Sequence, residues 1–335
     1  MYRENKSGLQ ILELEVTNKC NLNCKHCYVD KSAPEEMEFS FAENLIKQAN
    51  DMDVNRLIFT GGEPLLHKNI FELASLSKEL GIPQVELFTN GILISDKNVK
   101  KMSVFDSVQM SIDVPPGRAP SFRQDYSRLL EDRIELLKKN NIDVNLMATL
   151  SRSTMPFVEE LIDFADKKGV KISFDRFHNV FREKELEKEE LSSEELKKSL
   201  EKLYLKRKEG YDVGCSDPLL FLVDSERMSD LIDNAERKNG IVGGCMAGIA
   251  ALYISSFGDV FACPFIRIVV GNVRKDSLHD VWSMSKVLNL LRNRENLKGK
   301  CKTCEYRAAC GGCRQTAFSE SGDILGEDDI CWFKQ

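Results

Sequence analysis

Between residues 9 and 175, segments with the hydrophobic spacing of β-strands alternate with segments that have the spacing of α-helices. Short apolar or alternating runs predict six strands, at Leu12–Val16, Arg56–Thr60, Val85–Thr89, Ser107–Ile112, Asp143–Thr149 and Lys171–Asp175. Apolar residues three and four apart predict helices between them, at Phe41–Met52, Asn69–Leu80, Asp96–Met102, Tyr126–Asn140 and Met155–Lys168. This alternation predicts an α/β fold with a parallel sheet and right-handed crossovers. Six units fall short of a closed eightfold barrel, so we expect an open, partial (β/α)6 barrel of the TIM type.

Polar and glycine-rich turns follow four of these strands. The strand at Leu12–Val16 leads into a cysteine loop, and the next three lead into Gly61-Gly62-Glu63-Pro64, Thr89-Asn90-Gly91 and Ser111-Ile112-Asp113. In folds of this kind, functional residues gather at the carboxyl ends of the strands. The four turns are therefore expected to share one rim of the barrel.

The character of the chain changes after the sixth strand. Residues Arg182–Gly210 are dense in Glu and Lys with Leu at helical spacing, which predicts a solvated amphipathic helix. Beyond Asp224 the chain becomes rich in Gly and Cys, as in small domains that depend on metal clusters for stability. We predict a core domain over residues 1–225 and a cluster-binding domain over 226–335.

Composition and charge bear on whether the protein binds nucleic acid and on the cellular compartment in which it works. The chain has 335 residues, 42% of them hydrophobic, and a net charge of −6 with both signs interspersed, so nothing indicates a nucleic-acid partner. Neither a signal peptide nor a long apolar stretch is visible, which predicts a cytoplasmic protein without a membrane anchor.

Eleven cysteines in a cytoplasmic chain indicate metal or cluster ligands, because the cytosol keeps thiols reduced. They are unevenly distributed, and none lies between Tyr28 and Gly214. The three nearest the N-terminus, Cys20, Cys24 and Cys27, have CX3CX2C spacing. Three thiolates on an iron–sulfur cluster leave one iron open for chemistry, whereas a structural site uses four protein ligands. The alternative is half of a zinc site, but no fourth Cys or spaced His pair lies nearby.

The CX3CX2C motif after a first strand, followed by Gly-Gly-Glu-Pro after the second, resembles the radical S-adenosylmethionine (SAM) superfamily. The resemblance implies that SAM chelates the open iron of a [4Fe–4S] cluster and is cleaved to a 5′-deoxyadenosyl radical. It also implies that SAM is bound by His26, Gly61, Gly62, Glu63, Thr89, Asn90, Ser111 and Asp113, and Arg176, from its place at the end of the sixth strand, is a further candidate to pair with the SAM carboxylate. From the residues alone, the glycines also fit a tight turn in which Pro64 opens a helix, and Ser111 and Asp113 also fit capping.

The C-terminal cysteines resemble the SPASM domain, an accessory domain that holds auxiliary iron–sulfur clusters. The resemblance implies one [4Fe–4S] cluster on Cys301, Cys304, Cys310 and Cys331, and a second on Cys245, Cys263 and Cys313. Cys313 follows Cys310 after two residues, where three are usual. Two structural zinc sites are the alternative.

Cys215 is left unassigned by this pattern. It could complete the second auxiliary site, act catalytically as a hydrogen-atom donor, or be a small buried hydrophobe. His67, His178 and His279 have no metal-like spacing and are interpreted as surface or core residues. Asp175, Arg176 and His178 end the sixth strand and could line the substrate cavity.

We therefore predict a radical SAM/SPASM enzyme that abstracts a hydrogen atom from its substrate. A ribosomally made peptide or protein is the favoured substrate, with leader recognition by a separate protein or by the core, and with a flavodoxin or ferredoxin as reductant. Side-chain modification of a haem-pathway tetrapyrrole is the first alternative. A non-catalytic iron–sulfur or zinc protein for electron transfer or assembly is the second, but it has no use for the Gly-Gly-Glu-Pro turn.

Overall fold

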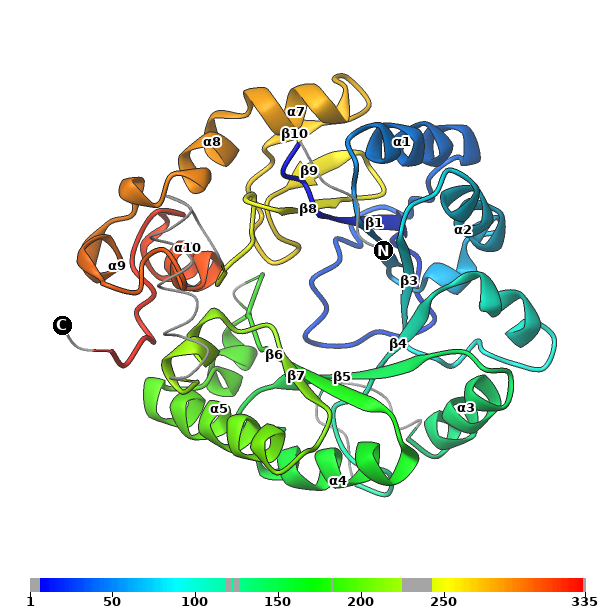
Figure 1. Cartoon of the computed structure of the whole chain (residues 1–335), viewed down its shortest axis with the longest axis horizontal. Helices are drawn as coiled ribbons and strands as arrows, with labels where there is room; N and C mark the ends of the chain where they lie inside the picture. The colour runs from blue at the N-terminus through cyan, green and yellow to red at the C-terminus, as the bar shows by residue number, and fades with distance from the viewer. Residues whose placement is uncertain (1–6, 119–121, 123–126, 182, 225–242, 334–335) are drawn as a thin grey trace. The chain divides into compact units, whose positions relative to one another are not determined.

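A computed structural model of the chain describes residues 7–118, 122, 127–181, 183–224 and 243–333 (Figure 1). The chain divides into two compact units. The first unit combines Met1–Met147 with Ala250–Ser285, and the second combines Ala148–Ile249 with Lys286–Gln335. The predicted domain boundary at 225–226 lies outside the described residues.

The first unit is built on parallel strands in sequence order. They are β1 (Ile11–Thr17), β2 (Arg56–Gly61), β3 (Gln84–Thr89), β4 (Ser107–Ser111) and β5 (Val144–Leu150), the last of which runs into the second unit. The connecting helices lie outside the strands (Figure 1): α1 (Phe39–Asp51), α2 (Ile70–Glu79), the 3-10 helix η2 (Val99–Val104) and α3 (Ser127–Lys139). These elements confirm the predictions to within a few residues, except that the helix predicted at Asp96–Met102 is a 3-10 helix.

The core of this unit forms where the predicted apolar faces meet. Strand β1 buries Leu12, Leu14 and Val16 completely, and α1 buries the positions spaced three and four apart, Ala42, Leu45, Ile46 and Ala49. Each fully buried Leu or Ile side chain contributes roughly 1.5–3 kcal/mol relative to an exposed one. The alternating pattern in the sequence therefore fixes which face of each element points inward.

Three further strands extend the first unit, and the sequence did not predict them. Strand β8 (Ala251–Ile254) pairs in parallel with β1, and the antiparallel strands β9 (Asp259–Phe261) and β10 (Gly271–Asn272) follow it. The buried Glu15 carboxylate on β1 accepts hydrogen bonds from the Tyr253 hydroxyl and from the Ser256 hydroxyl at 2.6 Å. Strands of two to four residues are too short for a period to be visible.

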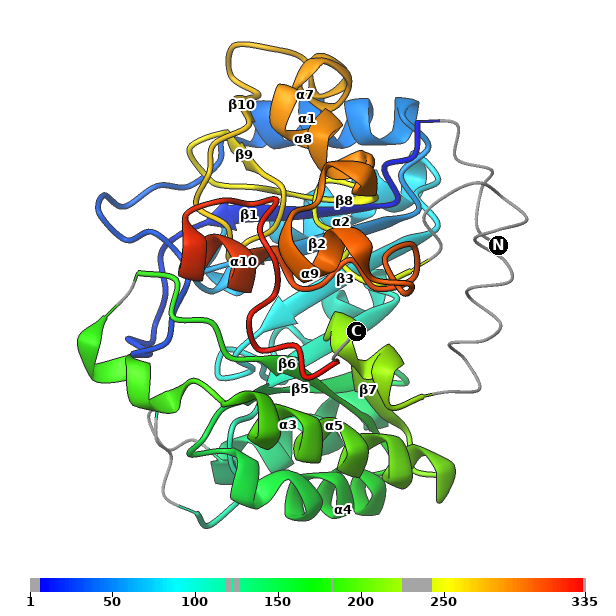
Figure 2. The ribbon, with the colours of Figure 1, turned by 90° about the vertical axis from the view of Figure 1, so that its left-hand side faces the viewer.

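The second unit contains the parallel pair β6 (Lys171–Arg176) and β7 (Val213–Cys215). Helices α4 (Val158–Lys168) and α5 (Ser193–Lys208) lie side by side (Figure 2), with Lys202 and Glu159 3.0 Å apart. The remaining elements are short: η3 (Met155–Phe157), η4 (Lys184–Glu189), η5 (Pro218–Leu222), α8 (Lys286–Arg292), η6 (Arg294–Asn296), α9 (Gly299–Thr303) and α10 (Arg314–Ser321). In the first unit, α7 (Leu278–Met284) follows β10.

Helix α5 confirms the amphipathic helix predicted within Arg182–Gly210, although Arg182 itself lies outside the described residues. A capping box fixes its start, because Glu195 N–H donates to the Ser192 hydroxyl at 3.3 Å and Ser192 N–H donates to the Glu195 carboxylate at 2.8 Å. Across the described part of the chain, no helix is long and apolar enough to cross a membrane.

Replacing Ser192 with Ala is expected to destabilise the start of α5 by about 1 kcal/mol, because a helix N–H loses its acceptor. Hydrogen–deuterium exchange of the amides at the start of α5 measures this directly and should become faster. The control Ser193→Ala changes the adjacent serine without removing the cap. Equal exchange rates in both variants would contradict the assigned role of Ser192.

Candidate functional site

The turn after β2 is bonded to the backbone that leads to the first cysteine. Gly62 N–H donates to the Thr17 carbonyl at 2.8 Å, and Glu63 N–H donates to the Lys19 carbonyl at 2.8 Å. A Cβ at Gly61 would lie 2.1 Å from the Thr17 oxygen, and one at Gly62 would lie 2.3 Å from the Lys19 oxygen. Glycine is therefore required here by the chain's own backbone, in addition to any approach to a ligand.

Glu63 connects this turn to the turn after β3. Its buried carboxylate accepts hydrogen bonds from the Thr89 hydroxyl at 2.7 Å, from Asn90 N–H at 2.9 Å and from Leu65 N–H at 3.1 Å. Burial raises the pKa of Glu63 to about 7, against the opposing effect of these three donors. A carboxylate has about four acceptor sites, so three donors leave room for one more.

Asn90 extends the connection to the cysteine loop. Its amide nitrogen donates to the Asn21 side-chain oxygen at 2.8 Å and lies 4.0 Å from the Cys20 sulfur, which also receives the Leu22 N–H at 3.4 Å. Burial raises the pKa of Cys20, and the negative charge of Glu63 adds to the rise. Ligation to iron would deprotonate this thiol.

The segment after β4 lies against the same cysteine loop. His26 Nε2 is 4.0 Å from the Asp113 carboxylate, and the His26 ring lies 4.8 Å from the Phe122 ring, centroid to centroid. Lys25 N–H donates to the Phe122 carbonyl at 3.2 Å, and Ser111 is the last residue of β4. The predicted residues of the cysteine loop and of the turns after β2, β3 and β4 thus meet in the first unit. Their contacts with SAM remain predictions.

The thiols of the first unit supply the number of protein ligands that a cluster with one open iron requires. Zinc binds thiolates at about 2.3 Å, so its sulfur ligands must lie within roughly 4 Å of one another. Among the described residues, no group of three or more His, Cys, Asp or Glu is arranged to hold a single metal ion. Cys20, Cys24 and Cys27 are partly exposed and supply three thiols. This donor set suits a cubane cluster with one open iron.

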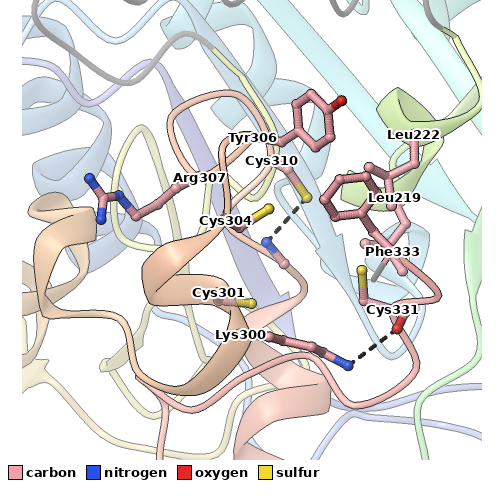
Figure 3. A pocket seen from close by; sticks show the side chains of 12 residues that line it. Leu219, Leu222, Lys300, Cys301, Cys304, Tyr306, Arg307, Cys310, Cys331 and Phe333 are labelled. Atoms are coloured by element: carbon pink, nitrogen blue, oxygen red, sulfur yellow. Dashed lines mark hydrogen bonds between the residues drawn. The ribbon is translucent and has the colours of Figure 1, made fainter. Parts of the chain in front are cut away.

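Four thiols of the second unit line one pocket (Figure 3). They belong to Cys301, Cys304, Cys310 and Cys331, the set predicted for one auxiliary cluster. The pocket has an empty volume of about 410 Å³ including its open mouth, and its other lining side chains include Leu219, Leu222, Tyr306 and Phe333. The four thiols in this pocket supply the number of protein ligands that a [4Fe–4S] cluster takes.

Hydrogen-bond donors contact two of these four sulfurs and one cysteine carbonyl. Gly312 N–H donates to the Cys310 sulfur at 3.3 Å, and Arg314 Nη2 donates to the Cys301 sulfur at 3.8 Å. Lys300 Nζ donates to the Cys331 carbonyl at 3.2 Å, as Figure 3 also shows. Burial raises the pKa values of the Cys310 and Cys331 thiols. Donors to sulfur offset this cost once the thiols ionise on binding a cluster.

The two-residue link between Cys310 and Cys313 has a structural explanation. Gly311 and Gly312 have φ values of +71° and +63°, which L side chains rarely adopt. A Cβ at Gly311 would lie 2.7 Å from Arg294 Nε, and one at Gly312 would lie 2.8 Å from Arg314 Nη2. The glycine pair therefore makes the tight turn that the shortened spacing requires.

Arg176 is the centre of a buried ion network in the second unit. Its guanidinium donates two bonds to the Asp217 carboxylate, at 2.5 and 2.8 Å, and one to the Thr316 hydroxyl at 2.9 Å. It also lies 3.5 Å from Asp328, which accepts the Cys313 N–H at 2.8 Å. The predicted contact of Arg176 with the SAM carboxylate remains untested, and in the second unit its donors serve this network.

His178, two residues after Arg176, was named from the sequence as a core, surface or cavity residue, but its contact with a cysteine was not foreseen. Its Nε2 lies 3.7 Å from the Cys313 sulfur. Burial, helped by the neighbouring Arg176 charge, lowers the pKa of His178 to about 4, so the imidazole is neutral at pH 7. The only available signal was that side chains two residues apart on an extended chain point the same way.

The remaining predicted ligands lie in different parts of the fold. Cys245 N–H donates to the Cys310 carbonyl at 3.0 Å, whereas Cys263 follows β9 in the first unit. Cys215 ends β7, and burial raises the pKa of its thiol. The set of Cys245, Cys263 and Cys313 stays a prediction, as do both roles of Cys215.

Comparison with known proteins identifies two families. Residues 14–166 match the radical SAM superfamily, and residues 245–305 match the SPASM iron–sulfur cluster-binding domain. The chain is 28% identical over 340 residues to an AdoMet-dependent heme synthase of Methanosarcina barkeri, covering 97% of each protein. It is 24% identical over 352 residues to a PqqA peptide cyclase of Xanthomonas axonopodis pv. citri, covering 95% of this chain and 86% of the cyclase.

Among solved structures, the chain is similar to Streptococcus suis SuiB bound to the precursor peptide SuiA. The TM-score is 0.80 at 19% identity, covering 98% of this chain and 77% of SuiB. This likeness confirms the predicted α/β fold class, a partial barrel with a parallel sheet. The chain belongs to the radical SAM superfamily and carries a C-terminal SPASM domain, so its cofactors are SAM, the [4Fe–4S] cluster that binds SAM, and auxiliary iron–sulfur clusters.

Proposed function

We propose that this radical SAM enzyme oxidises a side chain of a tetrapyrrole in haem formation. The observation that carries the proposal is the similarity to the Methanosarcina barkeri heme synthase, which extends over 97% of both chains. The peptide cyclase is less similar and is covered less completely. The tetrapyrrole alternative raised by the sequence is therefore the better supported substrate class.

The first unit supplies the parts needed to start the reaction. When bound, SAM and its cluster supply a 5′-deoxyadenosyl radical that removes a hydrogen atom from the substrate. In this proposal Glu63 holds the turns around the SAM amino group, with its remaining acceptor site available to an N–H of that group. Thr89 and Asn90 keep the carboxylate in place.

In this proposal the second unit holds the electron acceptor of the reaction. A side chain that has lost a hydrogen atom must also lose one electron to complete a two-electron oxidation. The pocket of Cys301, Cys304, Cys310 and Cys331 offers ligands for an electron-accepting cluster beside apolar side chains. We assign the auxiliary clusters this role.

Peptide modification is the second candidate, favoured by the similarity to the peptide cyclase. In that case a separate leader-binding protein could deliver the substrate. Both candidates need a flavodoxin- or ferredoxin-type reductant, because the cluster that binds SAM must be reduced before the reaction starts.

A direct substrate comparison tests the proposal. The anaerobically reconstituted enzyme is incubated with reductant and SAM, and with either iron coproporphyrin or a short peptide encoded beside the gene. We expect 5′-deoxyadenosine formation to increase with the porphyrin and the porphyrin to change mass.

Cys24→Ala, which removes one predicted ligand of the SAM-binding cluster, should abolish both signals. A mass change of the peptide alone would overturn the tetrapyrrole proposal and support the second candidate. Absence of 5′-deoxyadenosine with every substrate would contradict the radical mechanism itself.

SAM affinity is expected to depend on the ionisation of Glu63. Its pKa in the folded protein is about 7, so below pH 7 the group is largely protonated and is a weaker acceptor for a SAM N–H. Affinity should therefore rise as the pH increases from 6 to 8. Glu63→Gln should bind SAM roughly tenfold more weakly at pH 8, because it lacks a charged acceptor, and its affinity should not vary with pH.

Equilibrium titration of reconstituted protein with SAM measures both effects. Glu43→Gln is a suitable control, because Glu43 is an α1 carboxylate that pairs with Lys47 at 2.9 Å away from the site. A pH dependence that survives in Glu63→Gln would assign it to another group.

The two predicted roles of Cys215 can be separated by counting iron. If Cys215 completes an auxiliary site, Cys215→Ala should lower the iron content and alter the auxiliary-cluster signal in electron paramagnetic resonance. If Cys215 donates a hydrogen atom, the iron content stays constant while product formation falls. Unchanged iron and unchanged activity together leave it as a buried thiol.

A further inference from the structure

Arg176 at the end of β6 and His178 two residues later are both connected to Cys313, one indirectly and one directly. Arg176 reaches the backbone of Cys313 through Asp328, whose carboxylate accepts the Cys313 N–H at 2.8 Å. His178 reaches the sulfur itself, with 3.7 Å between Nε2 and Sγ. Both contacts lie within the second unit. The segment from Arg176 to His178 is therefore connected to the main chain of Cys313 and contacts its thiol.

Ligation of a cluster decides which group donates in the His178 contact. A cysteine that binds iron does so as a thiolate, which has no proton and can only accept hydrogen bonds. The His178 nitrogen that faces it must then carry the proton. A contact of 3.7 Å is a normal length for an N–H···S hydrogen bond.

The neighbouring cation, Arg176, has other partners than the Cys313 sulfur. The Arg176 guanidinium is already bonded to Asp217 and Thr316, and it faces Asp328 as well. Its charge is thus matched by two buried carboxylates. His178 makes a direct polar side-chain contact with the Cys313 sulfur, which also receives a backbone hydrogen bond from Thr316.

We propose that His178 donates a hydrogen bond to the Cys313 thiolate and thereby raises the reduction potential of the auxiliary cluster that this thiolate holds. A hydrogen bond to a ligating sulfur stabilises the more negative, reduced cluster more than the oxidised one. The inference rests on the proposed function in one respect, namely that Cys313 is a ligand of an electron-accepting cluster. His178 is therefore a positioning residue that makes this cluster a better acceptor.

The test is a redox titration of the holoenzyme followed by electron paramagnetic resonance, with iron counted in each variant. His178→Leu removes the donor and keeps an apolar side chain. At a fixed potential, the ratio of reduced to oxidised auxiliary cluster should fall roughly three- to tenfold, which is about 30 to 60 mV for one electron. His178→Gln retains an N–H donor and should recover most of the shift. His279→Leu replaces an exposed histidine on α7 and should change nothing.

The outcomes separate this inference from the proposed function. An unchanged potential in His178→Leu would overturn it, and so would loss of iron, which would make His178 a ligand instead of a donor. Retention of every cluster signal in Cys313→Ala would remove its basis as well. In each of these cases, 5′-deoxyadenosine formation with iron coproporphyrin still reports independently on the substrate assignment.

Discussion

The buried carboxylate of Glu63 holds together the turns on which the candidate SAM site depends. Isolated in an apolar interior, such a group would strongly favour its neutral form. Here three donors from two different turns face it, so the same carboxylate that is costly to bury also fixes the relative positions of Thr89 and Asn90. Asn90 in turn reaches Asn21 in the cysteine loop. Removing the charge would therefore disturb the geometry around Cys20 as well as any contact with a ligand.

Arg176 has the corresponding role in the second unit, with the opposite charge. It joins the end of β6 to Asp217, to Thr316 on α10 and to Asp328. Breaking a buried ion pair from one side typically costs 3–5 kcal/mol, because the remaining charge stays buried without a partner. The loops around Cys313 are short and irregular, so a network of this kind replaces the apolar core that they cannot form.

The sequence was sufficient for the parallel strands and for most of the helices, because their apolar faces are long enough to show a period. It was not sufficient for β8, which has four residues and whose pairing with β1 depends on a contact between distant segments. The glycines of the turn after β2 were correctly placed, but the backbone of Thr17 and Lys19 that excludes a side chain could not be foreseen. The contact between His178 and Cys313 was not foreseen for the same reason, since the two residues are 135 positions apart. Local patterns report local structure, and sites assembled from distant segments require the fold.

The two buried charges also give the thiols of the two units different electrostatic environments. Burial is the largest influence on both Cys20 and Cys313. The nearby charge with the largest effect on Cys20 is Glu63, opposed by Lys31, and the one with the largest effect on Cys313 is Arg176, opposed by Asp328 and Asp217. A nearby negative charge makes a cluster harder to reduce and a stronger reductant, whereas a nearby positive charge does the reverse. In the proposed function, the carboxylate of Glu63 would favour an electron-donating cluster at Cys20, and the guanidinium of Arg176 would favour an electron-accepting cluster at Cys313. At Cys313 the two carboxylates that neutralise Arg176 reduce this effect, so the electrostatic environment there depends on the whole buried network and not on Arg176 alone.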